Sequence, residues 1–365
     1  MDYMKQAILL AEKAMHIASP NPTVGTVVVK DGKIVGQGVT EKYGGAHAEV
    51  VAIAEAGAEA KGATLYTTLE PCSHFGKTGP CSQALIKAGV AEVHMAILDP
   101  SKKVNGQGRS EMEKAGIKVV VGEHSAEVEK LHEFFIKHVK TGLPFVFLKW
   151  AMTADGFVAR SNQKPGEQFI ISGPEAKINT HKLRQSVDAI LVGAETIVKD
   201  DPSLTVRLEN VEARHPIRII LDTTGRTPVN SKVISGGLLG KTIVATTNQI
   251  DLNQKGAYKK NGVEVIVLES KEGNIDLDQL LKKLGDMKIT SLLVEGGPTI
   301  HKSFIDQNLV DKLLVYVSQD ELGKGVPAAL NIDQIEEKFL VEKSQIRKDE
   351  MLIGYILSKR SKKTA

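Results

Sequence analysis

The chain has 365 residues, of which 42% are hydrophobic and 25% are charged, and its formal net charge is +3 at pH 7. These proportions are ordinary for a folded, water-soluble protein, so they argue against disorder, collagen-like repetition and a polybasic nucleic-acid arm. Aromatic residues make up only 4% of the chain, which leaves few surfaces on which single-stranded bases can stack. The length predicts two domains of about 150 residues or somewhat more.

The chain carries two cysteines, too few for a disulfide framework, and this favours a reducing compartment such as the cytoplasm. Residues 1–6 do not form a basic region followed by a long apolar run, so we expect no secretory signal. We find no apolar run of the length needed to cross a membrane. These patterns predict a cytoplasmic protein with neither a membrane nor a nucleic acid as partner.

The first half of the chain alternates predicted helices and strands. Apolar residues recur at helical spacing from Met4 to Ala18 and stop before two prolines, which predicts a first helix over 4–18. An Asp31-Gly32 pair between two strand-like segments predicts a hairpin with a type I′ turn. The remaining predicted segments are helix 47–56 closed by a left-handed Gly57, strand 63–69, helix 82–88, strand 92–98, helix 110–115, strand 117–121 and helix 127–140. This order predicts a mixed sheet covered by helices on both faces.

A Gly-Leu-Pro segment at 142–144 is the best candidate for a domain boundary. It divides the chain into predicted domains 1–143 and 144–365. Strand candidates after this point lie at 145–149, 189–193, 217–222, 242–246, 263–268, 291–294 and 312–317. They predict a second α/β domain, although a fold class by itself assigns no activity.

The most specific motif combines His47-Ala48-Glu49 with two Pro-Cys pairs that end at Cys72 and Cys81. Two thiolates and one imidazole suit zinc, and three protein ligands leave a fourth position for water, as in catalytic zinc sites. Zinc lowers the pKa of that water from about 15.7 towards 7 and so supplies hydroxide at neutral pH. We expect each ligand to precede or open a helical segment, whose positive end favours a thiolate.

Glu49 is the candidate proton shuttle between the zinc-bound water and a leaving amine. In a regular helix residues i and i+2 point about 200° apart, so the geometry requires the metal to lie at the helix end. A His-x-Glu motif followed by Pro-Cys-x-x-Cys is the signature of zinc-dependent deaminases, in which the glutamate is the acid/base. The alternative interpretation is a structural zinc, or two buried reduced cysteines with an unrelated histidine.

This chain has eight residues, 73–80, between the cysteines where the general signature has two. With that insertion, segments 19–25 and 69–74 resemble the deaminase half of the bifunctional riboflavin-biosynthesis deaminase/reductase family. The resemblance implies a cytidine-deaminase-like α/β/α sandwich that removes the 2-amino group of 2,5-diamino-6-(5-phosphoribosylamino)pyrimidin-4(3H)-one. Lys77 and His74 are candidate contacts of the substrate phosphate, although a solvated loop lysine is the commoner state.

The second half has no Gly-x-Gly-x-x-Gly motif after a strand, so a standard dinucleotide-binding domain is not predicted. A buried-strand pattern over 291–294 leads through Glu295-Gly296-Gly297 to Pro298, which suits the first position of a helix running to about Asp306. Backbone amides at that helix start can bind a phosphate. The alternative is an ordinary strand-turn-helix corner.

Segments 148–156, 188–193, 200–207 and 293–297 look like the reductase half of the same family, whose fold is similar to dihydrofolate reductase. The resemblance implies an NADPH-dependent reduction of the ribosyl group to a ribityl group. The implied NADPH contacts are Ala151, Ile170, Thr196, Asp200, Thr223, Gly297, Pro298, Thr299, Ile300, His301, Lys302 and Ser303. The implied substrate contacts are Gln168, Arg184, Leu204, Arg207 and Glu295. Arginine suits a phosphate because its guanidinium can donate two parallel hydrogen bonds.

The leading hypothesis is therefore a bifunctional enzyme that uses Zn²⁺ and NADPH on a phosphorylated pyrimidine. The family resemblance also implies a homo-oligomer. A deaminase of nucleosides or tRNA bases with a non-catalytic second domain is the first alternative, and modest charge with few aromatics argues against a polynucleotide substrate. A non-enzymatic binding module with a structural zinc is the second.

Overall fold

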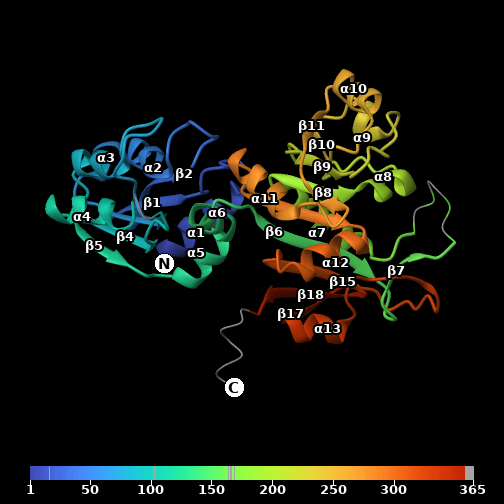
Figure 1. Cartoon of the computed structure of the whole chain (residues 1–365). Coiled ribbons are helices and arrows are strands. Elements are labelled where there is room, and N and C mark those ends of the chain that lie inside the picture. Colours follow the sequence, from blue (N-terminus) through green and yellow to red (C-terminus); the bar gives the residue numbers. More distant parts are fainter. Residues whose placement is uncertain (16, 102–103, 163, 165–166, 168, 358–365) are drawn as a thin grey trace. The chain divides into compact units, whose positions relative to one another are not determined.

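The computed structural model describes residues 1–357 except 16, 102–103, 163, 165–166 and 168. The predicted contact Gln168 lies outside the described residues. The chain divides into two compact units, Met1–Gly142 and Leu143–Ala365, and Figure 1 labels their helices and strands. Each unit has its own main sheet, so each is described by itself.

The first unit contains a five-stranded mixed sheet. Its strands, in spatial order, are β2 (Lys33–Val39), β1 (Gly25–Lys30), β3 (Thr64–Leu69), β4 (Glu92–Ile97) and β5 (Lys118–Val121). β1 is antiparallel to β2 and β3, whereas β3, β4 and β5 are parallel. Asp31 and Gly32 have φ angles of 48° and 74°, which confirms the predicted hairpin turn.

Helices cover both faces of this sheet. One core contains residues of α1 (Tyr3–Lys13), α5 (Ser125–Leu131) and α6 (Glu133–Thr141), and the other contains residues of α2 (Ala48–Ala56), α3 (Cys81–Ala88) and α4 (Gln107–Lys114). Val27 belongs to the first core and its neighbour Val28 to the second, as the two-residue period of a strand requires. The predicted three-layer arrangement is therefore confirmed.

Two glycines of β2 allow α2 to lie directly on the sheet. A Cβ at Gly36 would lie 2.2 Å from the Ala52 carbonyl oxygen, and one at Gly38 would lie 2.1 Å from that of Ala48. Neither distance can accommodate a real side chain. Because α2 begins immediately after His47, this close approach positions the first part of the predicted zinc site.

Three helix predictions in the first unit are wrong in detail. The first helix ends at Lys13 and not at Ala18. Gly57 has φ 55° and ψ −127°, which is not a left-handed cap, and a 3₁₀ helix, η1 (Gly57–Ala60), follows it. The helix predicted over 127–140 is two helices that meet at His132, whose side chain is 3% exposed. A break at a buried residue lets both helices turn apolar side chains to the sheet, which one straight helix over this segment would not do.

The second unit contains a nine-stranded sheet. Its strands, in spatial order, are β11 (Glu264–Val267), β10 (Thr242–Thr246), β9 (Ile217–Leu221), β8 (Ala189–Gly193), β14 (Ser291–Gly296), β6 (Phe145–Met152), β15 (Lys312–Val317), β18 (Asp349–Ile356) and β17 (Phe339–Ile346). The strands from β11 to β15 are parallel, and β18 and β17 form an antiparallel hairpin at one edge. All seven predicted strands are present, but this hairpin was not predicted, because β17 exposes most of its residues and lacks a clear apolar pattern.

The second unit also contains helices and short strands outside that sheet. The helices are α7 (Pro174–Ser186), α8 (Ala194–Asp200), α9 (Lys232–Ser235), α10 (Leu252–Lys260), α11 (Leu277–Asp286), α12 (Pro298–Asp306) and α13 (Ile332–Lys338), and the strands are β7 (Phe157–Arg160), β16 (Gly325–Pro327), β12 (Ser270–Lys271) and β13 (Asn274–Ile275). The predicted helix starting at Pro298 is confirmed as α12. Because the central strands are parallel, their carboxyl ends meet at one edge of the sheet, where ligands bind in open α/β folds.

Candidate active sites

His47, Cys72 and Cys81 form a compact cluster of metal-binding atoms in the first unit. Their ligand atoms all lie within 4.8 Å of one another. His47 Nδ1 is 3.2 Å from Cys81 Sγ and 3.5 Å from Cys72 Sγ. A tetrahedral zinc with bonds of about 2.1 Å to nitrogen and 2.3 Å to sulfur separates such donors by roughly 3.6 Å. The three side chains therefore fit zinc, with Nδ1 as the histidine ligand.

Glu49 lies beside this cluster and is almost completely buried. It is the second residue of α2 and is 3% exposed. Burial, with a smaller contribution from the neighbouring Cys72, raises the pKa of Glu49 to about 7, although hydrogen bonds, one of them with the Cys81 thiol, oppose this rise. A carboxyl group with a pKa near neutrality can both accept and donate a proton. His47 is the N-cap of α2 and has extended backbone angles. It therefore lies at the helix end, so the 200° separation of residues i and i+2 within a regular helix does not apply to His47 and Glu49.

The prediction that every ligand directly precedes or opens a helical segment is wrong for Cys72. His47 caps α2 and Cys81 is the first residue of α3, but Cys72 lies in the loop after β3. The Cys81 backbone N–H nevertheless donates to Cys72 Sγ at 3.3 Å, so the Cys72 sulfur still lies at the start of α3. Hydrogen bonding to Cys81 lowers the pKa of Cys72, which favours the thiolate that a metal needs.

The inserted segment 73–80 contributes one side chain to the cluster. Thr78 Oγ1 lies 3.5 Å from His47 Nε2, the ring nitrogen that faces away from the sulfurs. A partner at this nitrogen helps to fix the orientation of a ligating histidine. Lys77 Nζ lies 3.9 Å from the centre of the Tyr43 ring, and both Lys77 and His74 are exposed. Their predicted contact with a substrate phosphate stays a prediction.

Glu70 is a buried residue near the cluster that the sequence analysis did not single out. Its side chain is 3% exposed, and its carboxylate accepts hydrogen bonds from the backbone N–H groups of Asp99, Gly106 and Arg109 at 3.0, 2.9 and 3.1 Å. Glu70 therefore fastens Asp99, Gly106 and the first turn of α4 to the end of β3, two residues before Cys72. The sequence signal that could have identified Glu70 is its position directly before the first Pro-Cys pair.

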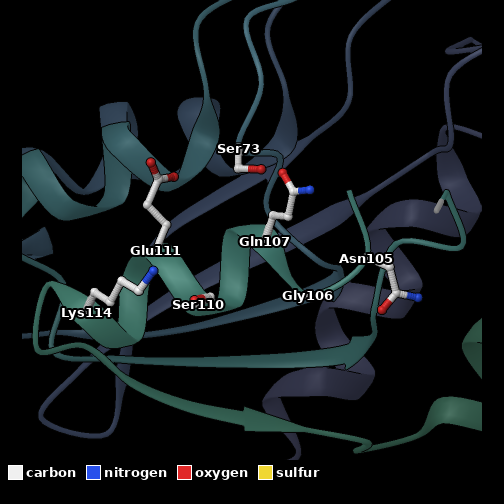
Figure 2. A pocket seen from close by; sticks show the side chains of 7 residues that line it. All are labelled: Ser73, Asn105, Gly106, Gln107, Ser110, Glu111 and Lys114. Carbon is white, nitrogen blue, oxygen red and sulfur yellow. The ribbon is translucent and has the colours of Figure 1, made fainter. Parts of the chain in front are cut away.

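A cavity of about 550 Å³ lies beside Gly106 and α4. Figure 2 shows that Ser73 faces the first turns of α4 across it, and its lining consists of Ser73, Asn105, Gly106, Gln107, Ser110, Glu111 and Lys114. Neither Glu49 nor any of the three predicted zinc ligands lines the cavity. It is therefore a neighbour of the zinc cluster and not the cluster's own cleft.

In the second unit, four predicted NADPH contacts come together at the carboxyl edge of the sheet. Ala151 lies near the end of β6, Thr196 in the first turn of α8 after β8, Thr223 after β9 and Gly297 after β14. β9, β8, β14 and β6 are consecutive in the sheet. Residues spread over almost 150 positions of the chain therefore line one edge, which is the place where parallel sheets bind nucleotides.

The Gly296-Gly297 turn leads into α12 and faces Thr196. A Cβ on Gly296 or Gly297 would lie 3.6 or 3.7 Å from Thr196 Oγ1, an ordinary contact distance. Gly297 is the N-cap of α12, and its first turn has no side-chain cap among the described residues. Free backbone N–H groups and the helix dipole suit a phosphate. The residues present thus fit the diphosphate of a dinucleotide.

Arg184 and Glu295, both predicted substrate contacts, form a buried bidentate ion pair. Arg184 Nε and Nη2 donate to the two Glu295 carboxylate oxygens, each at 2.7 Å, and the side chains are 13% and 9% exposed. Burial alone would raise the pKa of Glu295, but the Arg184 guanidinium outweighs it and lowers the pKa to about 2. Most of this guanidinium is therefore engaged within the protein, and Glu295 is ionised.

Lys149 is a half-buried lysine of β6 that the sequence analysis did not identify. Burial lowers the pKa of Lys149, the Glu295 charge partly opposes that effect, and the Arg184 charge adds to it. Its Nζ lies 5.6 Å from the centre of the Tyr316 ring. Lys149 precedes Ala151 on β6 by two residues, so its side chain leaves the same face of the strand. The only signal was a lysine inside an otherwise apolar strand.

The other predicted substrate contacts lie in the segment between α8 and β9. Leu204 is 3% exposed and has a φ angle of +53°, a region that costs a branched residue about 1–2 kcal/mol. Arg207 is exposed, and its backbone N–H donates to His181 Nδ1 at 3.3 Å. Burial, with the nearby charges of Arg184 and Arg207, lowers the pKa of His181 to about 4, so this ring is a neutral acceptor at pH 7.

Three further predicted cofactor contacts are Ile170, Asp200 and His301. Ile170 is 75% exposed. Asp200 lies at the end of α8, and burial raises the pKa of its carboxyl group. His301 is 3% exposed, its Nε2 is 3.2 Å from the Val294 carbonyl oxygen, and its ring contacts Trp150. The His301 ring therefore faces the core, and only its backbone remains a candidate for cofactor contact.

These two sites define a zinc-binding deaminase unit and an α/β reductase unit in one chain. Residues 1–97 match the cytidine and deoxycytidylate deaminase zinc-binding region, and residues 144–348 match the RibD C-terminal domain. The chain is 42% identical over 346 residues to the riboflavin biosynthesis protein RibD of Aquifex aeolicus, covering 94% of each chain. It is 38% identical over 347 residues to that of Escherichia coli, covering 92% of each.

Solved structures agree with this assignment. The chain is similar to Acinetobacter baumannii RibD, with a TM-score of 0.85 and 33% identity over 98% of both chains. It is equally similar to a diaminohydroxyphosphoribosylaminopyrimidine deaminase/5-amino-6-(5-phosphoribosylamino)uracil reductase of Thermotoga maritima, with a TM-score of 0.85, 34% identity and coverage of 97% and 98%. The chain therefore belongs to the RibD family of bifunctional riboflavin-biosynthesis enzymes.

Membership of this family confirms the predicted fold classes. The first unit is a cytidine-deaminase-like domain and the second a reductase domain like dihydrofolate reductase. It also confirms zinc and NADPH as the cofactors. Within the described part of the chain, no helix is both long and apolar enough to cross a membrane.

Proposed function

We propose that domain 1–143 deaminates 2,5-diamino-6-(5-phosphoribosylamino)pyrimidin-4(3H)-one and that domain 144–365 reduces the ribosyl group of the product to a ribityl group. The two reactions are those in the name of the similar Thermotoga maritima protein. The observation that carries the proposal is the cluster of His47 Nδ1 with the two cysteine sulfurs, beside the buried Glu49. A phosphorylated pyrimidine is thus the proposed substrate of both domains.

In the deaminase domain, His47, Cys72 and Cys81 are the proposed zinc ligands and Glu49 the proton carrier. When bound, zinc supplies the acidity that makes water a nucleophile, and in the other domain NADPH supplies a hydride. Glu49 accepts one proton of the attacking water and passes it to the ring nitrogen beside the reacting carbon. It then carries the remaining hydroxyl proton to the amino group, which leaves as ammonia while the ring carbon becomes a carbonyl. Its pKa of about 7 suits both steps.

In the reductase domain, Ala151, Thr196, Asp200, Thr223, Ile170 and the backbone from Gly297 to Ser303 are the proposed NADPH contacts. Gln168, Arg184, Leu204, Arg207 and Glu295 are the proposed substrate contacts. The Arg184–Glu295 pair holds a fixed carboxylate at the end of β14. Opening of the ribosyl ring requires a proton on the ring oxygen, and Lys149 beside Glu295 is the proposed donor.

A Glu49→Gln variant tests the deaminase mechanism. Because the amide cannot carry the proton, we expect ammonia release to fall by about 10²- to 10⁴-fold, with zinc content unchanged. Glu55→Gln is the matched control, since Glu55 is an exposed carboxylate on the same helix. NADPH oxidation with the deaminated substrate should not change in either variant. Unchanged ammonia release in Glu49→Gln would remove Glu49 from the mechanism.

We also propose that the protein is a cytoplasmic homo-oligomer, as its family resemblance implies. Its free cysteines suit a reducing compartment. Light scattering coupled to size-exclusion chromatography tests the oligomeric state, and a molar mass equal to that of one chain would refute it.

A further inference from the structure

Residues 201–208, between α8 and β9, form neither a helix nor a strand, and the structure describes all of them. They include Leu204 and Arg207, two of the proposed substrate contacts. A segment of this kind has no ladder of backbone hydrogen bonds, so its buried N–H and C=O groups need other partners. The shape of the segment, and with it the position of both contacts, therefore depends on the groups that bind its backbone.

Two histidines bind successive backbone N–H groups of this segment. The Val206 N–H donates to His215 Nδ1 at 3.2 Å, and the Arg207 N–H donates to His181 Nδ1 at 3.3 Å. His181 lies on α7 and is 4% exposed, whereas His215 lies shortly before β9. The segment is thus held by side chains from two different parts of the chain.

Helix α7 makes a second contact with the segment. Arg184 Nη1 donates to the Thr205 carbonyl oxygen at 3.2 Å, and the ion pair with Glu295 already fixes this arginine. His181 and Arg184 are three residues apart on the helix, so their side chains lie on the same face. Three consecutive residues, 205–207, are therefore each bound through a backbone atom by a side chain.

The residue before these three has an unfavourable backbone conformation. Leu204 has a φ angle of +53° and is 3% exposed. Such a conformation costs a branched residue free energy, persists only where the surrounding structure over-determines it, and is found most often at ligand-binding and active sites. The three hydrogen bonds at 205–207 provide that constraint directly beside Leu204. The segment is therefore held in one specific shape and not in the most relaxed one.

The accepting role of His181 requires a neutral ring. A protonated imidazole donates from both nitrogens and cannot accept the Arg207 N–H. Burial, with the charges of Arg184 and Arg207, lowers the pKa of His181 to about 4. The ring is therefore neutral at pH 7 and carries its proton on Nε2, which leaves the Nδ1 lone pair for the backbone.

We propose that His181 and His215 are positioning residues of the reductase site, which hold segment 204–207 in the shape that meets the phosphorylated substrate. They act through the backbone of the segment and not by contact with the substrate or with NADPH. The proposal rests on the proposed reductase function. Loss of either acceptor should weaken substrate binding and leave the rate at saturation nearly unchanged, the pattern typical of interactions that bind substrate and transition state equally.

Steady-state kinetics of the full chain, with NADPH and the deaminated substrate, test this proposal. In His181→Leu we expect KM for that substrate to rise roughly 10-fold, the effect of one unpaired buried N–H, while kcat stays within about twofold. His181→Asn keeps an acceptor, because its Oδ1 is as many bonds from Cα as Nδ1 is in histidine. It should restore KM to within about threefold of the wild type.

His215→Leu and His215→Asn repeat the comparison at the neighbouring N–H group and should behave in the same way. Lys182→Leu is the matched control, because Lys182 is exposed and adjacent to His181 on α7. It should change neither KM nor kcat. Isothermal titration calorimetry should give the same Kd for NADPH in all these variants, since none of them changes a proposed NADPH contact.

An unchanged KM in either leucine variant would overturn the proposal. A KM that rises but is not restored by asparagine would also overturn it, because the acceptor would then not be the decisive feature. A large fall in kcat in both His181→Leu and His181→Asn would show that the ring takes part in the chemistry, which overturns it as well. If His181→Leu does not fold, the His215 pair decides. If the wild-type chain does not oxidise NADPH with this substrate, the proposed reductase function itself fails, so the two failures are distinguishable.

Discussion

The zinc centre and the reductase centre are built from different parts of the polypeptide. The zinc centre consists of side chains from residues 47 to 81, whose ligand atoms all lie within 4.8 Å of one another. The reductase centre is the carboxyl edge of a sheet, where Ala151, Thr196, Thr223 and Gly297 follow four different strands. Its most evident recognition element is the backbone turn at Gly296-Gly297, where α12 begins without a side-chain cap from any described residue.

This difference explains why the zinc centre is easily predicted from the sequence and the reductase centre is not. A metal selects residue types, because only a few side chains offer the nitrogen and sulfur atoms that zinc prefers. A dinucleotide phosphate accepts hydrogen bonds from backbone N–H groups, which every residue except proline can donate. Zinc binding therefore produces a recognisable motif of side chains in the sequence. Phosphate binding to backbone N–H groups produces little more than two glycines and a proline.

The largest effect expected from this comparison is the loss of one activity alone. Cys81→Ser removes a proposed zinc ligand, so we expect less bound zinc and ammonia release lower by more than about a thousandfold. NADPH oxidation with the deaminated substrate should persist, because no residue of the zinc cluster belongs to the second unit. Metal analysis and the two activity assays check this. Loss of both activities would break the separation between the two centres.

The second prediction concerns the stability of the reductase centre. Arg184→Ala leaves the buried Glu295 without its partner, so we expect the unfolding free energy of the second unit to fall by about 3–5 kcal/mol. Trp150, the one tryptophan of the chain, lies in β6, so its fluorescence during urea unfolding reports on this unit.

The control for this stability prediction is a variant that removes both charges, Arg184→Met with Glu295→Gln. It should recover part of the lost stability, since no unpaired charge remains. An Arg184→Ala variant as stable as the wild type would show that the pair does not hold the centre together.

The smallest predicted effect is on acid stability. Burial lowers the pKa of His301 to about 4, although a hydrogen bond to Val294 opposes this. The folded state therefore favours the neutral ring, so the stabilisation is complete above the ordinary pKa near 6.5 and declines as the pH falls towards 4. For His301 alone we expect a loss of about 2 kcal/mol between pH 7 and pH 5.

A His301→Gln variant isolates this contribution, because glutamine does not titrate and retains an N–H donor for the Val294 carbonyl. Urea unfolding followed by Trp150 fluorescence should show a smaller acid sensitivity in the variant than in the wild type. Equal sensitivity would mean that His301 does not account for it. His132 has the same property in the first unit, since burial lowers its pKa to about 4.

The sequence was a reliable guide wherever a local rule selects the residue. The Asp31-Gly32 turn, the helix that begins at Pro298 and the clustering of His47, Cys72 and Cys81 follow from turn geometry, the fixed φ of proline and metal chemistry. The sequence was a less reliable guide where the burial of side chains determines the secondary structure. The helix break at His132 and the exposed hairpin of β17 and β18 depend on what packs against them.

By itself, the sequence determined the two α/β units and singled out the proposed metal ligands and Glu49, because these depend on residue type and short spacing. Only the tertiary structure decided that Arg184 is held by Glu295 and that Lys149 lies near that pair. Each of these relations joins residues far apart in the chain, and the order of parallel strands in the sheet brings them together.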